Sequence, residues 1–208
     1  MEYSLYLVTD AGLSRGRTHR EIVQAALRGG VTVVQYREKN ASTRRMIEEA
    51  LELRDLCRAH GVPFIVNDRV DVALAVDADG IHLGQDDMPA SLARRLIGRD
   101  KILGVSAENV TQARAAVAEG ADYIGASPIF ATPTKPDAPP PMGVQGLQEI
   151  ARVCAIPIVA IGGLNATNVA SMMRAGAAGV AIVSAIVSVE DVERAARELK
   201  QIVESSRK

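Results

Sequence analysis

Cysteine is scarce in this chain, and apolar runs long enough to cross a membrane are missing. The two cysteines, Cys57 and Cys154, match no metal-ligand spacing and lie in helix-like segments, so buried free thiols are expected. No window approaches the roughly 18 consecutive apolar residues of a membrane-spanning helix, which excludes one. The first residues combine neither a basic segment nor a long apolar stretch, so a secretion signal is not expected.

Charge of one sign is also lacking. The formal net charge is −1, so the overall balance indicates neither nucleic acid nor an anionic membrane as a partner. Any positive field must therefore be local. Hydrophobic residues make up 48% and charged residues 24%, which is typical of a folded globular protein, and a cytoplasmic enzyme is expected.

Several catalytic signatures are absent as well. No Cys-His or Ser-His-Asp set indicates covalent catalysis, and no lysine lies inside an expected strand, where a Schiff base would form. The first expected strand-to-helix turn, residues 9–13, lacks the glycine fingerprint of dinucleotide-binding folds.

What is present is a regular alternation of strand-like and helix-like segments. Eight short runs rich in apolar and β-branched residues recur, and 208 residues divided by eight gives 26 per unit, enough for a strand, a loop and a helix. The runs occupy residues 5–9, 31–37, 63–68, 80–84, 102–107, 123–130, 157–163 and 179–185. Between them lie helical stripes such as Met46, Ala50, Leu53 and Cys57, or Val192, Ala195, Ala196, Leu199 and Ile202. Asn165 and Ser188 are expected to be helix N-caps.

Three strands follow the same kind of phrase, in which a helix ends at a glycine. The phrases are Arg28-Gly29-Gly30-Val31, Glu119-Gly120-Ala121-Asp122 and Arg174-Ala175-Gly176-Ala177. The alternation and this recurrence predict one α/β domain over residues 1–208, a single-domain (β/α)8 TIM barrel. A doubly wound open sheet is the alternative, but it would normally use fewer strands at this length.

In such barrels the site is built at the carboxyl ends of the strands. The second run ends in Gln35-Tyr36-Arg37-Glu38-Lys39, and strand alternation sends Gln35, Arg37 and Lys39 to one side. An amide and two cations then face the site if that side is the interior. Lys39 alone could equally be part of a solvated loop, whereas Arg37 continues a buried strand, where an unpaired guanidinium would be costly.

Acidic residues end the third and fourth strands. Asn67-Asp68 and the segment through Asp87 provide the hard oxygen ligands that Mg²⁺ prefers. An isolated Asn-Asp pair is usually a turn or cap, but acidic strand ends facing cationic ones favour a metal. His82 is expected to be a packed or hydrogen-bonded histidine.

The remaining strand ends offer small and hydroxylated residues. Ser106 could bind a ligand or cap the helix that starts near Asn109. Gly163 after the seventh run and Ser184 after the eighth match the phosphate cup of these barrels. The sixth run leads into Thr132-Pro133-Thr134-Lys135, where hydroxyls and one ammonium suit a phosphorylated ligand.

The motifs in this order closely resemble those of the thiamine phosphate synthase (thiamine-phosphate pyrophosphorylase) family. The resemblance covers nearly the whole chain. Its motifs are Leu5-Tyr6-Leu7-Val8-Thr9-Asp10, Gln35-Tyr36-Arg37-Glu38-Lys39, Val66-Asn67-Asp68, Asp79-Gly80-Ile81-His82-Leu83-Gly84-Gln85-Asp86-Asp87, Gly104-Val105-Ser106, Thr132-Pro133-Thr134-Lys135, Ile161-Gly162-Gly163 and Val183-Ser184.

The resemblance implies a transferase of thiamine biosynthesis. It would join hydroxymethylpyrimidine diphosphate to hydroxyethylthiazole phosphate, with dissociative loss of pyrophosphate, and would use Mg²⁺. The pyrimidine diphosphate would be bound by Gln35, Tyr36, Arg37, Glu38, Lys39, Asn67, Ser106 and Lys135, and Mg²⁺ by Asp68 and Asp87. The thiazole phosphate would be bound by Thr132, Pro133, Thr134, Gly163, Val183 and Ser184. The expected catalytic residues are Arg37, Lys39, Ser106 and Lys135, and a homodimer is expected.

The chain departs from the family pattern in places. It has Ala126-Ser127-Pro128 where Gly-Pro is expected, Glu108 after Ser106-Ala107, and a proline-rich segment at 136–142. These departures concern loop geometry and affinity rather than reaction class. Two other functions stay open: an isomerase of a thiazole or sugar phosphate, and a ligand-binding or regulatory barrel without turnover. Pyrophosphate release distinguishes the first from the synthase, and magnesium-dependent activity the second.

Overall fold

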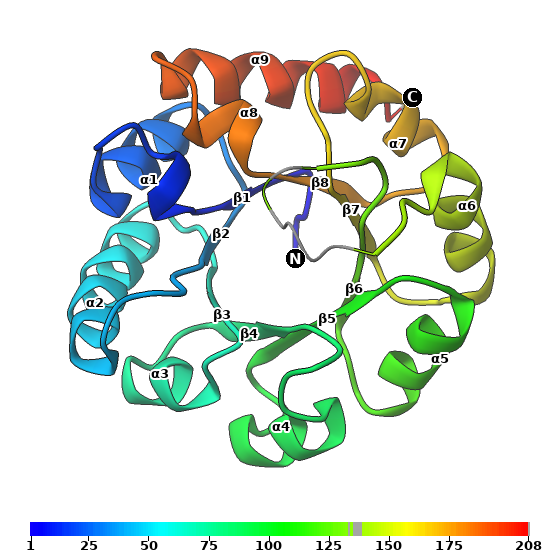
Figure 1. Ribbon diagram of the computed structural model, residues 1–208, viewed down its shortest axis with the longest axis horizontal. Helices are drawn as coiled ribbons and strands as arrows, with labels where there is room; N and C mark the ends of the chain where they lie inside the picture. The colour runs from blue at the N-terminus through cyan, green and yellow to red at the C-terminus, as the bar shows by residue number, and fades with distance from the viewer. Residues whose placement is uncertain (133, 135–138, 208) are drawn as a thin grey trace.

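The structure is a computed structural model that describes residues 1–132, 134 and 139–207. In these residues eight parallel strands close into a barrel in sequence order, with β8 paired to β1. Viewed down the barrel, the strands form an inner ring and the helices an outer one (Figure 1). The predicted (β/α)8 TIM barrel is confirmed.

The strands are short and agree in position with the predicted runs. They are β1 (Leu5–Val8), β2 (Val33–Tyr36), β3 (Phe64–Asn67), β4 (Gly80–Leu83), β5 (Ile102–Ala107), β6 (Tyr123–Ala126), β7 (Ile158–Ile161) and β8 (Gly179–Ile182). Most are shorter than predicted because pairing stops where the chain turns into the loops. The sixth run, predicted to reach residue 130, stops before Pro128, which has no N–H to donate.

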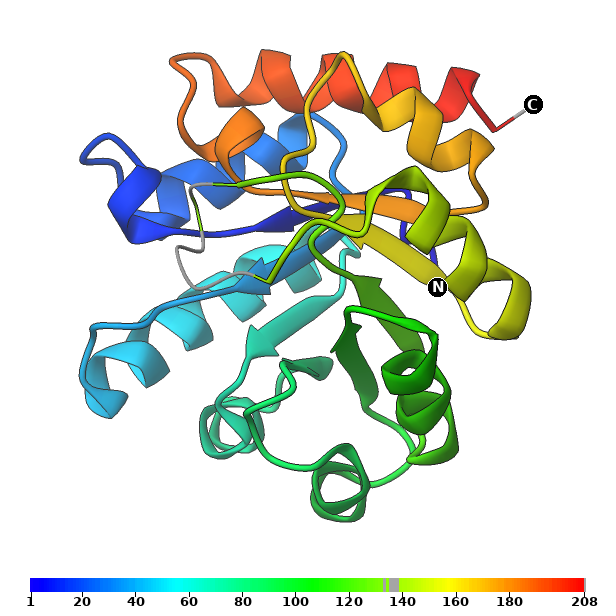
Figure 2. The same ribbon diagram turned by 45° about the vertical axis from the view of Figure 1, so that its right-hand side comes forward.

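Helices connect the strands and cover the outside of the barrel. They are η1 (Ala11–Leu13), α1 (His19–Arg28), α2 (Thr43–Ala59), α3 (Val70–Ala75), α4 (Ala90–Ile97), α5 (Val110–Ala118), α6 (Gly143–Val153), α7 (Val169–Arg174), α8 (Ser184–Val187) and α9 (Val192–Ser205). Helix α9 closes the ring by packing on α1, α7 and α8 (Figures 1 and 2). Among the described residues, none of these helices combines the length and the apolar character that crossing a bilayer requires.

The predicted stripe of α2 is its core face, whereas the stripe of α9 is confirmed only in part, because Ala195 and Ile202 are partly exposed. In α2 the buried residues are Met46, Ala50, Leu53 and Cys57, and in α9 they are Val192, Ala196, Leu199 and Val203. Both cysteines are free thiols; Cys57 is buried, and Cys154 is partly exposed. Burial raises the pKa of Cys57 to about 12, which makes it a packing residue rather than a nucleophile.

Both predicted N-caps were wrong. Helix α7 starts later than expected, after Asn168, because the side chain of Asn165 accepts hydrogen bonds from Thr167 in the preceding turn. Ser188 instead ends the short helix α8, and Asp191 caps α9 by accepting from the N–H of Arg194. The sequence pattern does not reveal the inserted turn of helix α8.

The core has two layers because parallel barrel strands are buried on both faces. Leu5 and Leu7 of β1 point outward into the layer between strands and helices. Tyr6 and Val8 point inward, where a smaller cluster fills the barrel. That inner cluster also contains Tyr3, Val33, Ile65, Tyr123, Val159 and Ala181. The interior is therefore packed, and it forms the base on which a site at one end can be built.

Candidate active site

A cavity of about 320 Å³ opens at the carboxyl ends of the strands. Its size suits a small-molecule ligand. The predicted site residues that line it are Gln35, Arg37, Lys39, Asn67, Asp68, Asp87, Ser106, Thr132, Thr134, Gly163, Val183 and Ser184. Side chains from strand ends all around the barrel thus meet at one mouth, as the barrel topology predicts.

The end of β2 supplies the cations. Gln35, Arg37 and Lys39 all face the cavity, which confirms the predicted alternation. The Arg37 side chain donates from Nη1 to Oδ2 of Asp10 at 2.6 Å, and the backbone N–H of Arg37 donates to the hydroxyl of Thr9. Lys39 forms an ion pair with Asp68. One partner holds each cation in place, and the remaining donors of the guanidinium and the ammonium are available to a ligand.

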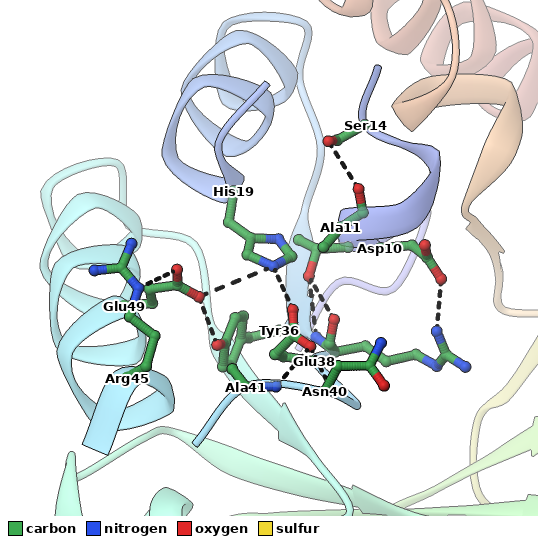
Figure 3. A network of polar contacts seen from close by, with 12 residues as sticks. Asp10, Ala11, Ser14, His19, Tyr36, Glu38, Asn40, Ala41, Arg45 and Glu49 are labelled. Atoms are coloured by element: carbon green, nitrogen blue, oxygen red, sulfur yellow. Dashed lines mark hydrogen bonds and ion pairs between the residues drawn. The ribbon is translucent and has the colours of Figure 1, made fainter. Parts of the chain in front are cut away.

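Tyr36 and Glu38, expected to bind substrate, do not line the cavity. They point outward toward α1 and α2 (Figure 3), as alternation between Arg37 and its neighbours requires. The Tyr36 hydroxyl donates to Glu49 at 2.8 Å. Both residues belong to the support of the loop rather than to its ligand-facing side.

Glu38 orders the backbone that follows Lys39. Its Oε1 accepts from the N–H groups of Asn40 at 2.6 Å and Ala41 at 3.2 Å, and its Oε2 lies 3.4 Å from Nε2 of His19 (Figure 3). Burial acts to raise the pKa of Glu38, but these donors outweigh burial and leave the pKa below its ordinary value. The carboxylate is therefore a stable anchor for the cation-bearing loop.

Two carboxylates, Asp68 and Asp87, lie beside the cations. Oδ2 of Asp87 accepts from the N–H of Gly84 at 2.7 Å, and burial together with the nearby Asp68 raises the pKa of Asp87. Asp68 has a φ of 60°, a left-handed conformation that aspartate tolerates better than most residues. Asp87, whose charge is disfavoured in this site, and the neighbouring Asp68 carboxylate are a donor set suited to a divalent cation.

The acidic set is small. In the described part of the chain, no cluster of three or more His, Cys, Asp or Glu side chains could hold a metal ion. Two carboxylates still fit Mg²⁺, which usually keeps several waters and takes its other ligands from substrate phosphates.

The opposite side of the mouth carries the glycines and hydroxyls of the predicted phosphate cup. Gly162 and Gly163 have φ values of 104° and 66°. A side chain at Gly163 would lie 2.7 Å from the carbonyl oxygen of Ala131, so the loop after β6 packs directly on this turn. Ser184 starts α8 beside it, and Thr132 and Thr134 complete the wall. Pro133 and Lys135, also predicted for this site, lie outside the described residues.

Comparison with known proteins gives consistent results. The family described as thiamine monophosphate synthase matches residues 5–186. A thiamine-phosphate synthase of Chloroflexus aurantiacus is 71% identical over 144 residues, which are 69% of this chain and 66% of that protein. A second thiamine-phosphate synthase, from Syntrophomonas wolfei, is 54% identical over 69% of each chain. This chain belongs to the thiamine monophosphate synthase family.

Structural comparison supports the same family. A solved thiamine phosphate pyrophosphorylase from Pyrococcus furiosus has a TM-score of 0.91 and 44% identity, and the match covers 98% of this chain and 96% of that one. The matches to curated relatives span only about two thirds of their length. The resemblance read from the sequence and the transferase class that it implies are confirmed at the level of the thiamine monophosphate synthase family.

The predicted site residues account for the rim of the cavity but not for its floor. Tyr6, His82, Tyr123 and Gly125 also line the cavity, although none of them was predicted as a site residue. His82 is buried and hydrogen-bonded as predicted, and burial lowers its pKa to about 4. Strand alternation could have revealed the two tyrosines, because both occupy inward positions one layer below the strand ends.

Ser106 lines the cavity and does not cap a helix. Its hydroxyl lies 2.9 Å from Nε2 of His82, and the N-cap of α5 is Asn109, which accepts from the N–H of Gln112. The capping alternative for Ser106 is therefore wrong, and its role in ligand binding stays a prediction.

Proposed function

We propose that this chain joins hydroxymethylpyrimidine diphosphate to hydroxyethylthiazole phosphate, forming thiamine phosphate and pyrophosphate. The observation that carries the proposal is the placement of Arg37, Lys39, Asp68 and Asp87 on one side of a single cavity, with Gly163 and Ser184 also lining it. One cavity thus has groups for a diphosphate and, separately, groups for a monophosphate.

The two phosphorylated substrates would occupy different parts of the mouth. Arg37, Lys39, Asn67 and Ser106 would bind the pyrimidine diphosphate. The thiazole phosphate would be held by Thr132, Thr134, Gly163, Val183 and Ser184. Pro133 and Lys135 remain in the proposed site on the basis of the family motif, with Lys135 on the diphosphate. Tyr36 and Glu38 are left out because they face the helices.

Asp68 and Asp87 would hold Mg²⁺ in this proposal. The chemistry that the ion supplies when bound is neutralisation of negative charge on the diphosphate. The pairing of Lys39 with Asp68 supports a shared role, because it places a cation and a carboxylate that would hold the metal in the same part of the cavity.

The chain's own residues would act chiefly by charge and position. Arg37 and Lys39 would bind more strongly as negative charge develops on the departing pyrophosphate, and would therefore favour the transition state. The enclosed cavity would hold the thiazole nitrogen near the carbon that it attacks and exclude water. No general base is needed, because the nitrogen uses its lone pair.

The test is to measure pyrophosphate and thiamine phosphate with both substrates and Mg²⁺, then with each component omitted. Formation of both products in equal amounts, only when all three are present, is the expected result. Turnover of the thiazole phosphate without pyrophosphate would favour the isomerase, and binding without turnover the regulatory barrel.

Asp87→Asn tests the metal assignment. The variant should need a higher Mg²⁺ concentration for half-maximal activity and turn over more slowly. Asp100→Asn, on the exposed loop between α4 and β5, is the matched control. An unchanged magnesium titration in Asp87→Asn would remove this residue from the metal site.

A cytoplasmic location and a homodimer are also part of the proposal, and rest on the family resemblance. Size-exclusion chromatography with light scattering tests the oligomeric state. A mass near 22 kDa, that of one chain, would contradict the dimer.

A further inference from the structure

A continuous chain of hydrogen bonds crosses the floor of the cavity. Nε2 of Gln35 lies 2.9 Å from the Tyr6 hydroxyl, which lies 2.8 Å from the Tyr123 hydroxyl. That hydroxyl lies 2.9 Å from Nδ1 of His82, whose Nε2 lies 2.9 Å from Oγ of Ser106. Tyr6 and Tyr123 are fully buried, so water cannot substitute for these partners. This series of hydrogen bonds connects two predicted site residues, Gln35 and Ser106, through three cavity-lining residues to which the proposed function assigns no role.

The direction of each hydrogen bond in this series can be assigned, starting from Gln35. The Gln35 amide nitrogen only donates, so the Tyr6 hydroxyl accepts from it. The Tyr6 hydroxyl is buried, and among the described residues its other hydrogen-bond partner is the Tyr123 hydroxyl, so Tyr6 donates to Tyr123. Tyr123 must then donate to Nδ1 of His82, because its other contact is already a donor. An imidazole that accepts at Nδ1 carries its hydrogen on Nε2 and donates to Ser106. The Ser106 hydrogen is left over, and Ser106 faces the cavity.

Two glycines, Gly104 and Gly125, leave space for the side chains that form these hydrogen bonds. A side chain at Gly104 would lie 2.1 Å from the Tyr123 ring, and one at Gly125 would lie 2.9 Å from the His82 ring. No ordinary side chain could occupy either position without moving a ring. The strands with these glycines therefore leave room for the rings of Tyr123 and His82.

We propose that Gln35, Tyr6, Tyr123 and His82 form a relay that makes the Ser106 hydroxyl a hydrogen-bond donor to the pyrimidine diphosphate. Tyr6, Tyr123 and His82 are then positioning residues, and the proposal rests on the function proposed above. The relay orients Ser106 without placing an ionised side chain beneath the substrate. An anionic diphosphate accepts hydrogen bonds and donates none, so only a serine that presents its hydrogen can bind it.

The first test is a double-mutant cycle on Tyr123→Phe and Ser106→Ala. Tyr123→Phe removes one hydroxyl and should lower kcat about tenfold, the value of one hydrogen bond of roughly 1.4 kcal/mol. If Tyr123 acts through Ser106, the same change should cost less than about twofold in the Ser106→Ala background. Losses that multiply would overturn the relay. Tyr3→Phe is the matched control and should keep activity. It also removes one tyrosine hydroxyl, from a ring whose centroid lies 4.9 Å from that of Tyr123.

Substitution of His82 provides a second, independent variant. His82→Gln keeps an N–H group that can reach Ser106, and His82→Leu does not. The glutamine variant should retain activity within about threefold of the wild type, and the leucine variant should lose about tenfold, as expected for one hydrogen bond. Equal losses would contradict a donor role for the histidine.

Nitrogen NMR of the histidine rings separates this proposal from the proposed function, because it needs no substrate. Wild-type His82 should show hydrogen on Nε2 and none on Nδ1, and Tyr123→Phe should alter this pattern. Hydrogen on Nδ1 in the wild type would overturn the relay, even in an active enzyme. Failure of the wild type to release pyrophosphate would instead overturn the synthase function.

Discussion

Arg37 shows how one residue can be both held and available. Its side chain is 21% exposed and pairs with Asp10 through Nη1, while its strand position directs it to the cavity. A guanidinium has five N–H donors, so a single carboxylate partner cannot satisfy it. The sequence predicts this role because Arg37 directly continues a buried strand.

Replacing Arg37 with methionine should therefore affect catalysis far more than stability. Arg37→Met keeps the apolar stem and should lower kcat/KM about 100-fold, as loss of one charge-stabilising donor does. The substitution should lower the free energy of unfolding by about 1 kcal/mol, because Asp10 loses its hydrogen-bond partner. Steady-state kinetics and urea unfolding measure the two quantities. Arg20→Met, which breaks a surface pair with Glu52, is the control, and similar results for both variants would refute the prediction.

His82 predicts a pH dependence of stability. Burial lowers its pKa to about 4 from an ordinary value of 6.5, so the folded state resists protonation that the unfolded state accepts. Above pH 6.5 both states are neutral and stability is full. Between pH 6.5 and about 4 the unfolded state gains a proton first, and stability should fall by about 3 kcal/mol, from 1.36 kcal/mol per pKa unit.

Unfolding at a series of pH values measures this effect. In His82→Gln the fall between pH 6.5 and 4 should be smaller by about the same 3 kcal/mol. His60→Gln, at the exposed end of α2, is the matched control. An identical pH slope in the wild type and His82→Gln would show that this histidine does not titrate as its burial requires.

At the scale of the element, the repeated unit is a helix that stops at a glycine before the next strand. Gly30, Gly120 and Gly176 have φ values of 92°, 95° and 103°, which other residues adopt rarely. The recurring glycine in these sequence segments is therefore explained by the positive φ that the backbone needs at the end of each helix. The predicted cap of α9 is wrong because the extra turn of α8 after β8 shifts the start of α9 without leaving a periodic signal. The predicted cap of α7 is wrong because the chain first forms a turn at Asn165.

At the start of a strand there can be no room for any side chain, and Gly179 is the clearest case. A side chain there would lie 1.7 Å from the carbonyl oxygen of Tyr3, since β8 and the segment before β1 meet at barrel closure. Gly179→Ala should lower the free energy of unfolding by about 3 kcal/mol or more, because the backbone itself must move. Urea unfolding measures this. Gly12→Ala, whose nearest neighbour is a side-chain oxygen at 3.3 Å, should cost much less, and equal costs would contradict the closure argument.

At the scale of the whole molecule, a nearly neutral protein concentrates its functional charge in one mouth. The net charge is −1, yet Arg37 and Lys39 share a cavity with three carboxylates, those of Asp68, Asp86 and Asp87. Attraction for phosphorylated ligands is thus local and depends on the parallel pairing of β2 with β3 and of β3 with β4, which brings the ends of these strands close together.

Mg²⁺ with pyrophosphate should consequently stabilise the whole barrel. A ligand that binds only the folded state adds about 2.7 kcal/mol at 100 times its Kd. For a chain of this size the melting temperature should rise by about 5–10 °C. Thermal unfolding with Mg²⁺ and pyrophosphate, and with sulfate at equal ionic strength, measures the shift. An equal rise in Arg37→Met would show that binding occurs elsewhere.

The sequence by itself determined the alternation of strands and helices, and with it the barrel and the strand ends that form the site. It could do so because side-chain periodicity and glycine stops are local properties of the chain. The folded structure was needed to show that the side of β2 with Gln35 and Arg37 faces the cavity, which leaves Tyr36 and Glu38 facing the helices, and that Tyr6, His82 and Tyr123 meet beneath the cavity. Those contacts join strands that are distant in sequence, and the closure and register of the barrel, which no local pattern encodes, set which inward side chains come within hydrogen-bonding distance.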